Sequence, residues 1–440
     1  MKFTTTCFVA TLILFLTYPG QTAVAQQTGE IPFATPEDVG MSTAKLQVVD
    51  DVMQALVDDG KMIGGIAIVA RKGKICFFED YGLADRENGK AMRKDSILRF
   101  YSMTKAVTTA GLLMLVDEGK LNVNDPVAKY LPAMSELTVV DGERTQPNKS
   151  VMTIADLMRH TSGLTYGHSK NTLHNELFKK HAPTDKKITL ADMPDRLKHV
   201  PLKFEPATAW EYGISIDVLG RVIEVVSSKT LEQFLTERFF KPLDMKDTGF
   251  HVPAEKHDRF AKCYRTPEKQ KKNEPKDGDG NPEFEYTNGF ALMPKETSEY
   301  LTPPAFQSGG GGLVSTARDY MRFLMMIERG GQLNGRRYLK PETVKLMTTN
   351  QTPPAAGWVR FGDEIRVGVG FSFGFSVRDK MSDWDPAGRV GEYGWGGAAS
   401  THYWVSPKDE LIVITLEQVR PYRWLTEFDV KKQIYDAVIE

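Results

Sequence analysis

A serine and a lysine three residues apart form a pair whose types and spacing could support nucleophilic chemistry. Ser102 and Lys105 open the stretch "SMTKAVTTAGLLMLV", residues 102–116. If this apolar run is a helix that begins at Ser102, both side chains lie on one face, about one turn apart. A serine hydroxyl is a weak nucleophile at neutral pH and needs a base within hydrogen-bonding distance. The pair is therefore either a nucleophile with its partner or a serine that caps an ordinary helix.

The expected surroundings of Ser102 would also favour catalysis. Backbone N–H groups at the start of a helix can stabilise an oxyanion. Burial of Lys105 beside an apolar helix should lower the lysine pKa from its usual value of about 10.4, so that some of it acts as a neutral base. Both effects depend on a helix that starts at Ser102.

Two other serines compete with Ser102. Ser42 and Lys45 repeat the same spacing, but Ser42 stands where the N-cap of an exposed helix is expected, and capping accounts for it. Ser372 lies in "GFSFG", residues 370–374, which matches the elbow of strand–turn–helix hydrolases. Its flanks alternate as strands, no helix follows, and the one later histidine, His402, lies in another strand-like run. We interpret Ser372 as part of a sheet.

The composition is that of a soluble globular protein. The chain has 440 residues, of which 41% are hydrophobic and 26% are charged, and its net charge is -1. Such a balance gives no attraction to nucleic acid or to an anionic membrane. We therefore expect a small-molecule ester or amide substrate and no nucleic-acid partner. The sequence carries no signal for the oligomeric state.

Residues 1–25 predict a signal peptide. Lys2 precedes the apolar run "CFVATLILFLTY", and "AVA" at 23–25 supplies the small residues of a cleavage site. The run is too short to span a bilayer. We expect cleavage near Ala25, a secreted or periplasmic mature protein, and no stable membrane insertion.

The cysteines and histidines do not suggest a metal centre. Cys76 and Cys263 lie far apart, so although export permits a disulfide between them, they do not define a disulfide framework. Neither Cys-x-x-Cys nor His-Glu-x-x-His occurs in the sequence. We predict no metal and no cofactor.

The periodicity of apolar residues predicts helix and strands at both ends of the chain. A helix capped by Ser42 comes first, followed by a hairpin that turns at residues 72–74. The middle is helical, with one helix from a Thr153 cap to Gly163 and a longer run that Pro242 stops. Further strands and a last helix, "FDVKKQIYDAVIE", end the chain.

This order predicts an α+β fold, an antiparallel β-sheet flanked by helices with an inserted, mostly helical lobe. One sheet would be assembled from both ends of the chain. The charged residues 255–285 are interpreted as an exposed insertion. The predicted boundaries are a signal peptide at 1–25 and a single catalytic domain at 26–440, with a sheet lobe at about 36–115 and 300–440 and a helical lobe at about 116–299.

Five segments in this order carry a resemblance to a known family. They are "FYSMTKAVTTAGLLMLVDEGKLNVNDPVAKYLP", "TIADLMRHTSGL", "WEYGISIDVLGRVIEVVSSKTLEQFLTERFFKPLDMKDTGF", "SGGGGLVSTARDY" and "YGWGGAASTHYWVSP". Together they resemble the serine hydrolases related to class C β-lactamases and penicillin-binding proteins, and within these the family VIII carboxylesterases. The likeness spans roughly residues 36–420 and implies a β-lactamase/transpeptidase-like fold.

The resemblance also implies roles for single residues. Ser102 matches the family nucleophile and Lys105 its lysine partner, while Tyr212 in "EYGIS" matches the tyrosine that serves as general base and later as proton donor. Trp395-Gly396-Gly397 matches the strand motif that binds substrate. The N–H of the following residue, Ala398, is expected to form the oxyanion hole with that of Ser102.

The chain departs from the family pattern at two places. Ile214 stands where the family usually has the asparagine of Tyr-x-Asn, whose amide holds substrate and the lysine. Trp395 stands where β-lactamases have a lysine whose cation binds the substrate carboxylate. The loss of that charge favours a neutral, more apolar substrate and leaves Lys105 as the main cation beside Tyr212. His160, in "HTSGL", matches a structural position.

The predicted function is that of an exported serine hydrolase that cleaves short-chain carboxylic esters through an acyl-enzyme on Ser102. The region near Tyr166 and residues 255–285 would shape the acyl or alcohol pocket. Alternatives on the same site are a β-lactamase, a D-amino-acid peptidase or carboxypeptidase, and an acyltransferase. A non-catalytic peptidoglycan-binding or assembly protein is an alternative from a different class.

Overall fold

One antiparallel sheet organises the protein. The computed structural model describes residues 1, 30–168, 171–267 and 284–439, and within these an eight-stranded sheet has the order β14-β15-β16-β17-β18-β1-β2-β3. Each neighbouring pair is antiparallel. Its strands are β1 (Gly64–Arg71), β2 (Lys74–Asp85), β3 (Lys90–Ala91), β14 (Val369–Phe371), β15 (Ser376–Arg378), β16 (Tyr393–Gly397), β17 (Thr401–Ser406) and β18 (Leu411–Leu416).

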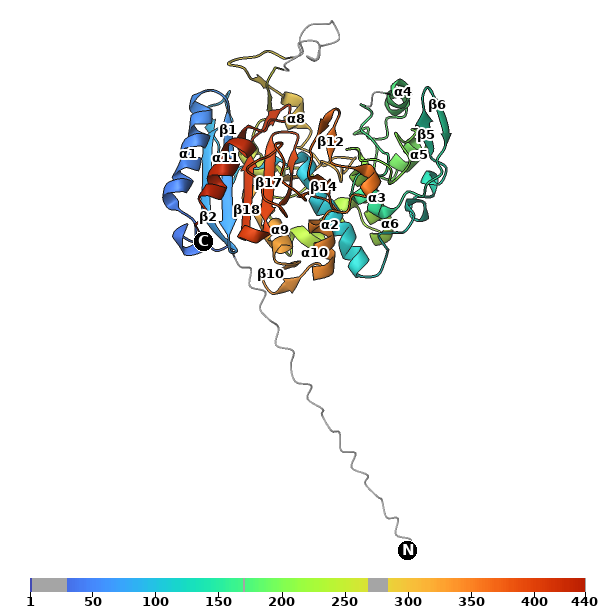
Figure 1. Cartoon of the computed structure of the whole chain (residues 1–440), viewed down its shortest axis with the longest axis horizontal. Coiled ribbons are helices and arrows are strands. Elements are labelled where there is room, and N and C mark those ends of the chain that lie inside the picture. The colour runs from blue at the N-terminus through green and yellow to red at the C-terminus, as the bar shows by residue number, and fades with distance from the viewer. Residues whose placement is uncertain (2–29, 169–170, 268–283, 440) are drawn as a thin grey trace.

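Strands from both ends of the chain meet in the middle of this sheet. β18 pairs with β1, so that Ile68 lies opposite Ile414 (Figure 1). The predicted fold class, with one sheet built from both ends, is confirmed. Residues 2–25 of the predicted signal peptide and residues 268–283 of the charged stretch lie outside the described residues.

The central strands are buried on both faces because their side chains alternate between two cores. On β1, Ile66 and Ile68 point into the larger core, and Ala67 and Val69 point into the smaller one. Burial on both faces explains why β1 is a nearly continuous apolar run. The sheet is therefore the middle layer of the molecule.

Helices cover both faces of the sheet. α1 and α11 pack side by side over the smaller core, and α9 packs against β1 and β18 on the other side (Figure 1). The helices are α1 (Thr43–Asp58), α2 (Thr104–Asp117), α3 (Ile154–Met158), α4 (Thr172–His181), α5 (Met193–Leu197), α6 (Ser215–Ser227), α7 (Leu231–Leu235), α8 (Pro294–Ser298), α9 (Ala317–Glu328), α10 (Pro341–Thr348) and α11 (Leu425–Asp436).

Short strands, and short 3-10 and π-helical turns, make up the rest of the described regular structure. The strands form pairs or a three-stranded sheet away from the main sheet. They are β4 (Leu98–Arg99), β5 (Thr138–Asp141), β6 (Arg144–Pro147), β7 (Tyr264–Arg265), β8 (Ala291–Leu292), β9 (Val314–Ser315), β10 (Gln332–Leu333), β11 (Arg336–Arg337), β12 (Arg360–Phe361), β13 (Glu364–Ile365) and β19 (Val419–Arg420).

α2 is the central helix of the molecule. Residues 104–115 are buried on all sides, as expected for a helix that is apolar all round. Gly111 permits this, because an added Cβ would lie 2.8 Å from the side chain of Leu235 on α7. α2 thereby joins the sheet to the helices of the middle of the chain, where it packs on α6.

The predicted bounds of two helical segments are wrong. α3 starts at the Thr153 cap but ends at Met158 rather than at Gly163, because His160 adopts a φ of 59°. The run predicted to continue to Pro242 breaks at Ser228, where φ is 56°. A new capping box at Thr230 then starts α7.

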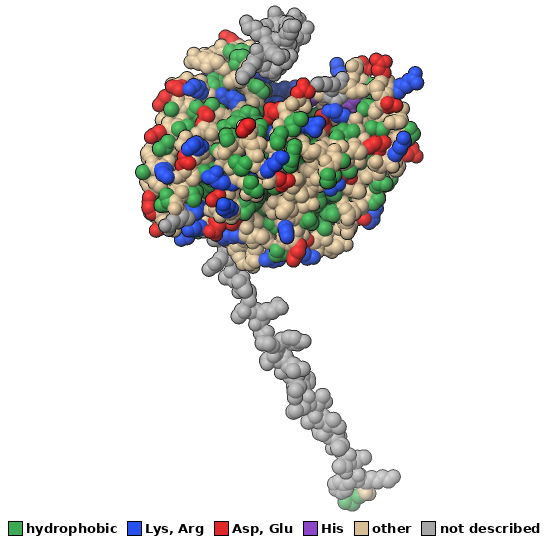
Figure 2. Space-filling model, in the orientation of Figure 1, with side chains coloured by type: hydrophobic (Ala, Val, Ile, Leu, Met, Phe, Trp, Pro, Cys, Tyr) green, Lys and Arg blue, Asp and Glu red, His purple; other side chains and the backbone are tan. Residues whose placement is uncertain are grey.

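The surface and the thiols agree with an ordinary globular chain. On the face shown in Figure 2, charged side chains of both signs are interspersed among apolar ones. Cys76 and Cys263 are both free thiols, so they do not form a disulfide with each other. Within the described ranges, no helix is long and apolar enough to cross a membrane.

Candidate active site

Ser102 lies in a single 3-10 turn, Tyr101–Met103, that leads directly into α2. Its Oγ does not cap the helix, since α2 has no side-chain cap. Instead, Lys105 Nζ donates a hydrogen bond to Ser102 Oγ over 3.2 Å. The capping alternative for Ser102 is therefore wrong, and the serine and lysine meet as their spacing predicts.

Lys105 is fully buried and has three hydrogen-bond acceptors. In addition to Ser102 Oγ, its Nζ donates to the hydroxyl of Tyr166 over 3.0 Å and to the carbonyl of Gly310 over 2.6 Å. A protonated lysine has three N–H donors. Each donor therefore has an acceptor, and none of the three acceptors is a carboxylate.

The expectation that burial lowers the pKa of Lys105 overall is wrong. Burial does lower it, but interactions with Tyr166, Tyr212 and Asp217 outweigh this effect and raise the pKa above its ordinary value. Lys105 is thus a cation in the resting site. A cation at this position can stabilise negative charge on a neighbouring oxygen.

Asp217 positions Gly310, the residue whose carbonyl accepts a hydrogen bond from Lys105. Its Oδ1 accepts from the N–H of Gly310 over 3.0 Å and from Ser308 Oγ over 2.5 Å. An added Cβ on Gly310 would lie 2.6 Å from Asp217 Oδ2, so only glycine fits there. The sequence reasoning missed Asp217, although the glycine run 309–312 was a signal of close packing.

Tyr212 lies against Lys105 and accepts a hydrogen bond from Trp395. Lys105 Nζ is 4.6 Å from the centre of the Tyr212 ring, and Trp395 Nε1 donates to the Tyr212 hydroxyl over 3.0 Å. In the sequence, Trp395 was notable only because it lacks the positive charge of the lysine that β-lactamases have at this position. Its indole N–H nevertheless supplies a donor to the oxygen that would carry the negative charge of a tyrosinate.

The end of β16 lies against the turn that carries Ser102. An added Cβ on Gly397 would come within 2.3 Å of the carbonyl oxygen of Phe100. The residue that follows β16, Ala398, lines the same cavity as Ser102. Ser102 and Ala398 thus line one cavity. Their assignment as oxyanion-hole donors stays a prediction.

Two predicted positions lie outside the cavity. Ile214 is fully buried in the core immediately before α6, and it is not among the residues that line the cavity. His160 is also fully buried, with its ring centre 4.8 Å from that of Tyr212. Burial and the charge of Lys105 lower the pKa of His160, which favours its neutral form. The ring packs against that of Tyr212.

The competing serines have structural roles. Ser42 caps α1 by accepting from the N–H of Lys45 over 3.4 Å. Ser372 is fully buried in the turn between β14 and β15, where its hydroxyl donates to the carbonyl of Phe375 over 3.0 Å. Ser42 is thus a helix cap and Ser372 is part of the sheet region, as both interpretations predicted.

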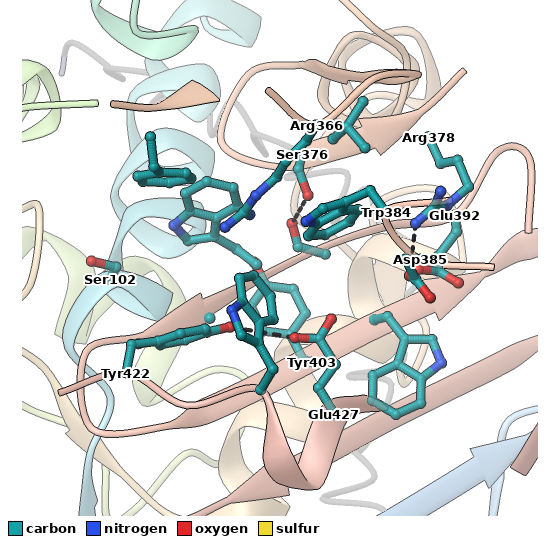
Figure 3. Close-up of a pocket in the computed structure, with 18 of the residues that line it drawn as sticks. Ser102, Arg366, Ser376, Arg378, Trp384, Asp385, Glu392, Tyr403, Tyr422 and Glu427 are labelled. Atoms are coloured by element: carbon teal, nitrogen blue, oxygen red, sulfur yellow. Dashed lines mark hydrogen bonds and ion pairs between the residues drawn. The ribbon is translucent and has the colours of Figure 1, made fainter. Parts of the chain in front are cut away.

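A cavity of about 360 Å³ opens beside Ser102 (Figure 3). Near the serine its wall is formed by Tyr212, Trp395 and the glycines of β16, and Phe361 adds a further aromatic ring. Among the described residues, no group of three or more His, Cys, Asp and Glu side chains could hold a metal ion. The wall of the cavity nearest to the serine is thus mostly aromatic.

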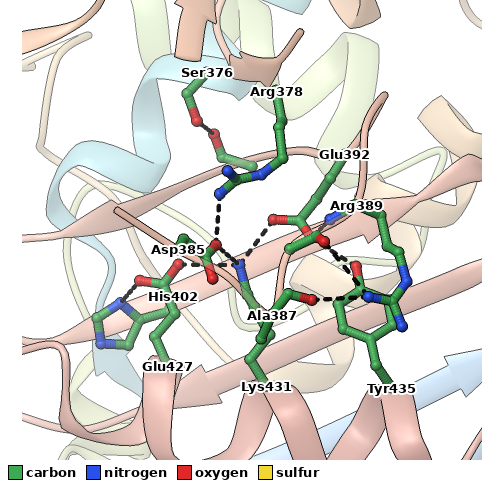
Figure 4. A network of polar contacts seen from close by, with 12 residues as sticks. Ser376, Arg378, Asp385, Ala387, Arg389, Glu392, His402, Glu427, Lys431 and Tyr435 are labelled. Carbon is green, nitrogen blue, oxygen red and sulfur yellow. Dashed lines mark hydrogen bonds and ion pairs between the residues drawn. The ribbon is translucent and has the colours of Figure 1, made fainter. Parts of the chain in front are cut away.

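The far end of the cavity is a buried ionic network that the sequence did not reveal (Figure 4). Lys431 Nζ, on α11, lies 2.8 Å from both Asp385 Oδ2 and Glu392 Oε1. Arg378 donates to Asp385 over 2.7 Å. These residues come from three separate segments, so no local spacing could predict them.

A family model for beta-lactamases matches residues 49–423 of the chain. This match covers far more than half of the sequence. The chain belongs to the beta-lactamase family. The predicted resemblance is therefore confirmed.

The relatives of this beta-lactamase-family chain include esterases. Esterase EstB of Burkholderia gladioli is 32% identical over 400 residues, which cover 88% of this chain and 92% of EstB. The lovastatin esterase of Penicillium rubens is 25% identical over 82% of this chain and 90% of its own length. The solved structure of EstCE1, described as a hydrolase with promiscuous acyltransferase activity, has a TM-score of 0.71 at 25% identity, covering 91% of this chain and 100% of EstCE1. The chain is a hydrolase of this family with esterase and acyltransferase relatives.

Proposed function

We propose that the protein is an exported serine hydrolase that cleaves short-chain carboxylic esters through an acyl-enzyme on Ser102. The observation that carries this proposal is the hydrogen bond of 3.2 Å between Lys105 Nζ and Ser102 Oγ, at the edge of a cavity that both Ser102 and Tyr212 line. The contact puts the Lys105 cation beside the oxygen that must lose its proton, and Tyr212, whose ring centre is 4.6 Å from the same Nζ, would supply the base that a serine nucleophile needs.

In the proposed reaction, Ser102 Oγ attacks the ester carbonyl carbon. Tyr212, acting as a phenolate beside the Lys105 cation, takes the serine proton as the Ser102 Oγ–carbon bond forms. When the ester C–O bond breaks, Tyr212 gives this proton to the departing alcohol oxygen. The N–H groups of Ser102 and Ala398 would hold the oxyanion. Water then attacks the acyl-enzyme, gives a proton back through Tyr212 to Ser102, and releases the acid.

Three features favour short esters over β-lactams. Trp395 puts a neutral indole where β-lactamases have a cation, and EstB and the lovastatin esterase are named as esterases. The cavity of about 360 Å³ is small for a ligand site, since such sites usually measure about 300–1,000 Å³. A short acyl or alcohol group matches this volume.

A substrate panel tests the proposal. Hydrolysis of p-nitrophenyl butyrate is compared with that of nitrocefin and a D-alanyl peptide, with and without an added alcohol as acyl acceptor. We expect turnover of the butyrate ester above that of the other two substrates. Preferred turnover of nitrocefin or of the peptide, or transfer to the alcohol in place of hydrolysis, would replace the ester function by the corresponding alternative.

The same assay tests the mechanism with matched serine variants. Ser102→Ala should lower kcat/KM by at least about a thousandfold, as the loss of a nucleophile does in serine hydrolases. Ser42→Ala and Ser372→Ala should retain activity, because one serine caps a helix and the other is buried in a turn. An inactive Ser372→Ala variant that is folded would contradict the mechanism.

Export is proposed from the sequence of residues 1–25. It is tested by expression of the full chain in a bacterium that has a periplasm, followed by fractionation and mass measurement of the protein. We expect a protein outside the cytoplasm whose first residue is Gln26. A full-length protein in the cytoplasm would refute export and leave the esterase proposal untouched.

A further inference from the structure

Arg366 is a buried cation in the catalytic cavity that the proposed mechanism does not use. It lies between β13 and β14, and its side chain is only 10% exposed. It lines the same cavity as Ser102 and Trp395. Figure 3 shows it entering the cavity between Ser102 on one side and Trp384 on the other.

Aromatic rings enclose the Arg366 guanidinium. Its central carbon lies 4.4–4.6 Å from the centres of three rings, those of Phe361, Trp384 and Trp424. The Trp395 ring, which also contacts Tyr212, is 6.0 Å away. Rings at these distances attract a cation and restrict its rotation. The guanidinium is therefore held in place by groups that leave its N–H donors unused.

Most donors of Arg366 are free to bind a ligand. Its Nε donates to Glu364 Oε1 over 3.2 Å, and among the described residues the terminal nitrogens have no hydrogen-bond partner. Burial lowers the pKa of Arg366, because the rings solvate the cation less well than water does. An anion at these nitrogens would therefore be favourable.

The carboxylates deeper in the cavity are bound to other groups. Asp385 accepts from Arg378 and Lys431, and Glu392 accepts from Lys431. Glu427 is 3.1 Å from His402 Nδ1. The network therefore has hydrogen-bond partners of its own. Arg366 interacts with the charges of Glu364 and Glu427, but among the described residues its terminal nitrogens donate no hydrogen bond to either.

We propose that Arg366 is the anion-recognition site of the catalytic cavity and that the natural substrate is an ester that also carries a carboxylate. A carboxylate can bind the two terminal nitrogens side by side, which is the strong geometry for arginine. This inference rests on the proposed esterase function and names its substrate class. Arg366 would thereby supply the positive charge that is missing at Trp395, and aromatic rings surround it.

The carboxylate could belong to the acyl part or to the alcohol part of the ester, so two pairs of esters separate the sources. On the acyl side, the mono-p-nitrophenyl ester of glutarate is compared with its neutral carboxamide analogue. On the alcohol side, 4-butyryloxybenzoate is compared with 4-butyryloxybenzamide. We expect kcat/KM for the charged ester to exceed that for the neutral one by about tenfold or more in one pair, mainly through KM.

Arg366→Gln should abolish this preference for the charged ester, and Arg366→Lys should retain part of it, because lysine keeps the charge but not the planar pair of donors. Arg360→Gln is the matched control, since Arg360 lies on the same hairpin and does not line the cavity. It should keep the preference of the unmodified protein. An equal preference in Arg366→Gln, or no preference in the unmodified protein for either pair, would overturn the proposal.

A binding measurement separates this inference from the esterase function. Titration with hexanoate should change the fluorescence of Trp384 and Trp424 in a saturable way, whereas hexanamide should not, and Arg366→Gln should lose the response. If hexanoate binds in this way but no ester is hydrolysed, the proposed function fails and the anion site stands. If esters are hydrolysed without binding of hexanoate or charge preference, the anion site fails. Should Arg366→Gln not fold, the unmodified protein's preference and titration decide the matter.

Discussion

Lys105 and Lys431 are both buried, but their surroundings are of opposite kinds. Lys431, at the far end of the cavity, has carboxylates of Asp385 and Glu392 at 2.8 Å. Lys105, beside Ser102, has only uncharged oxygens as hydrogen-bond acceptors. The first lysine lies among fixed opposite charges, and the second lies among hydroxyl groups that can exchange protons.

In the proposed mechanism, Lys431 therefore serves stability and Lys105 serves chemistry. Burial lowers the pKa of Lys431, but the charges of Glu392, Glu427 and Asp385 outweigh it and raise the pKa. Removal of Lys431 leaves buried carboxylates without a counter-charge. Removal of Lys105 leaves uncharged acceptors and one nearby carboxylate, Asp217, which keeps its hydrogen bonds from Ser308 and Gly310, so the loss there should be of activity more than of folding.

The largest expected effect is that of Lys105→Met. Without the cation, neither Ser102 nor Tyr212 has a positive partner for the charge that it develops. We expect kcat/KM for p-nitrophenyl butyrate to fall by about a thousandfold or more, with little change of the melting temperature. Retention of a tenth of the activity would show that Lys105 does not belong to the catalytic group.

Lys431→Met is the counterpart at the other end of the cavity. We expect the free energy of unfolding to fall by about 3–5 kcal/mol, as happens when one partner of a buried ion pair is removed. Urea unfolding measures this change, and the activity of the molecules that remain folded should change only a few-fold. A loss of stability below about 1 kcal/mol would show that Lys431 does not stabilise the fold, and the contrast with Lys105 would fail.

Glu427 makes the stability of the network depend on pH. Burial raises the pKa of Glu427, but its contacts with His402 and the charge of Lys431 outweigh this and lower the pKa to about 2 from an ordinary value of 4.5. A depressed carboxyl pKa stabilises the folded state above the unfolded pKa and loses that contribution as the pH falls toward 2. The shift corresponds to about 3 kcal/mol.

Unfolding free energies of the unmodified protein and Glu427→Gln between pH 6 and pH 2.5 measure this contribution. The unmodified protein should lose more stability than the variant below about pH 4.5. Parallel curves for the two proteins would show that Glu427 has an ordinary pKa.

The smallest expected effect is that of Trp395→Phe. The change keeps an aromatic ring but removes the N–H that donates to the Tyr212 hydroxyl. We expect kcat/KM to fall by about five- to tenfold, the equivalent of about 1 kcal/mol for one hydrogen bond. Trp358→Phe, a change outside the cavity, is the control, and equal effects of the two changes would remove Trp395 from the mechanism.

Local patterns predicted much of the fold and the reactive pair. The apolar run of β1 and the cap at Ser42 are visible in consecutive residues, and Ser102 and Lys105 meet because they are about one helical turn apart. The end of α3 could not be read in this way, because it depends on the left-handed backbone of His160. The division into a sheet lobe and a helical lobe at the stated boundaries stays a prediction.

Contacts between distant segments account for what the sequence did not predict. The partners of Lys105 at Tyr166 and Gly310, and the partners of Lys431, come together only through the tertiary fold. The net rise of the Lys105 pKa follows from the same cause, since the groups that raise it lie far away in the sequence. Arg366 gave no motif at all, because the rings around it come from strand β12, a turn and the N-cap of α11.

The most direct test of the central claim is the identity of the serine that reacts. The protein is treated with a fluorophosphonate, digested, and mapped by mass spectrometry, with Ser102→Ala in parallel. We expect one adduct, on the peptide that contains Ser102, and none in the variant. An adduct on Ser372 or another serine, or no adduct on a protein that hydrolyses p-nitrophenyl butyrate, would contradict the account.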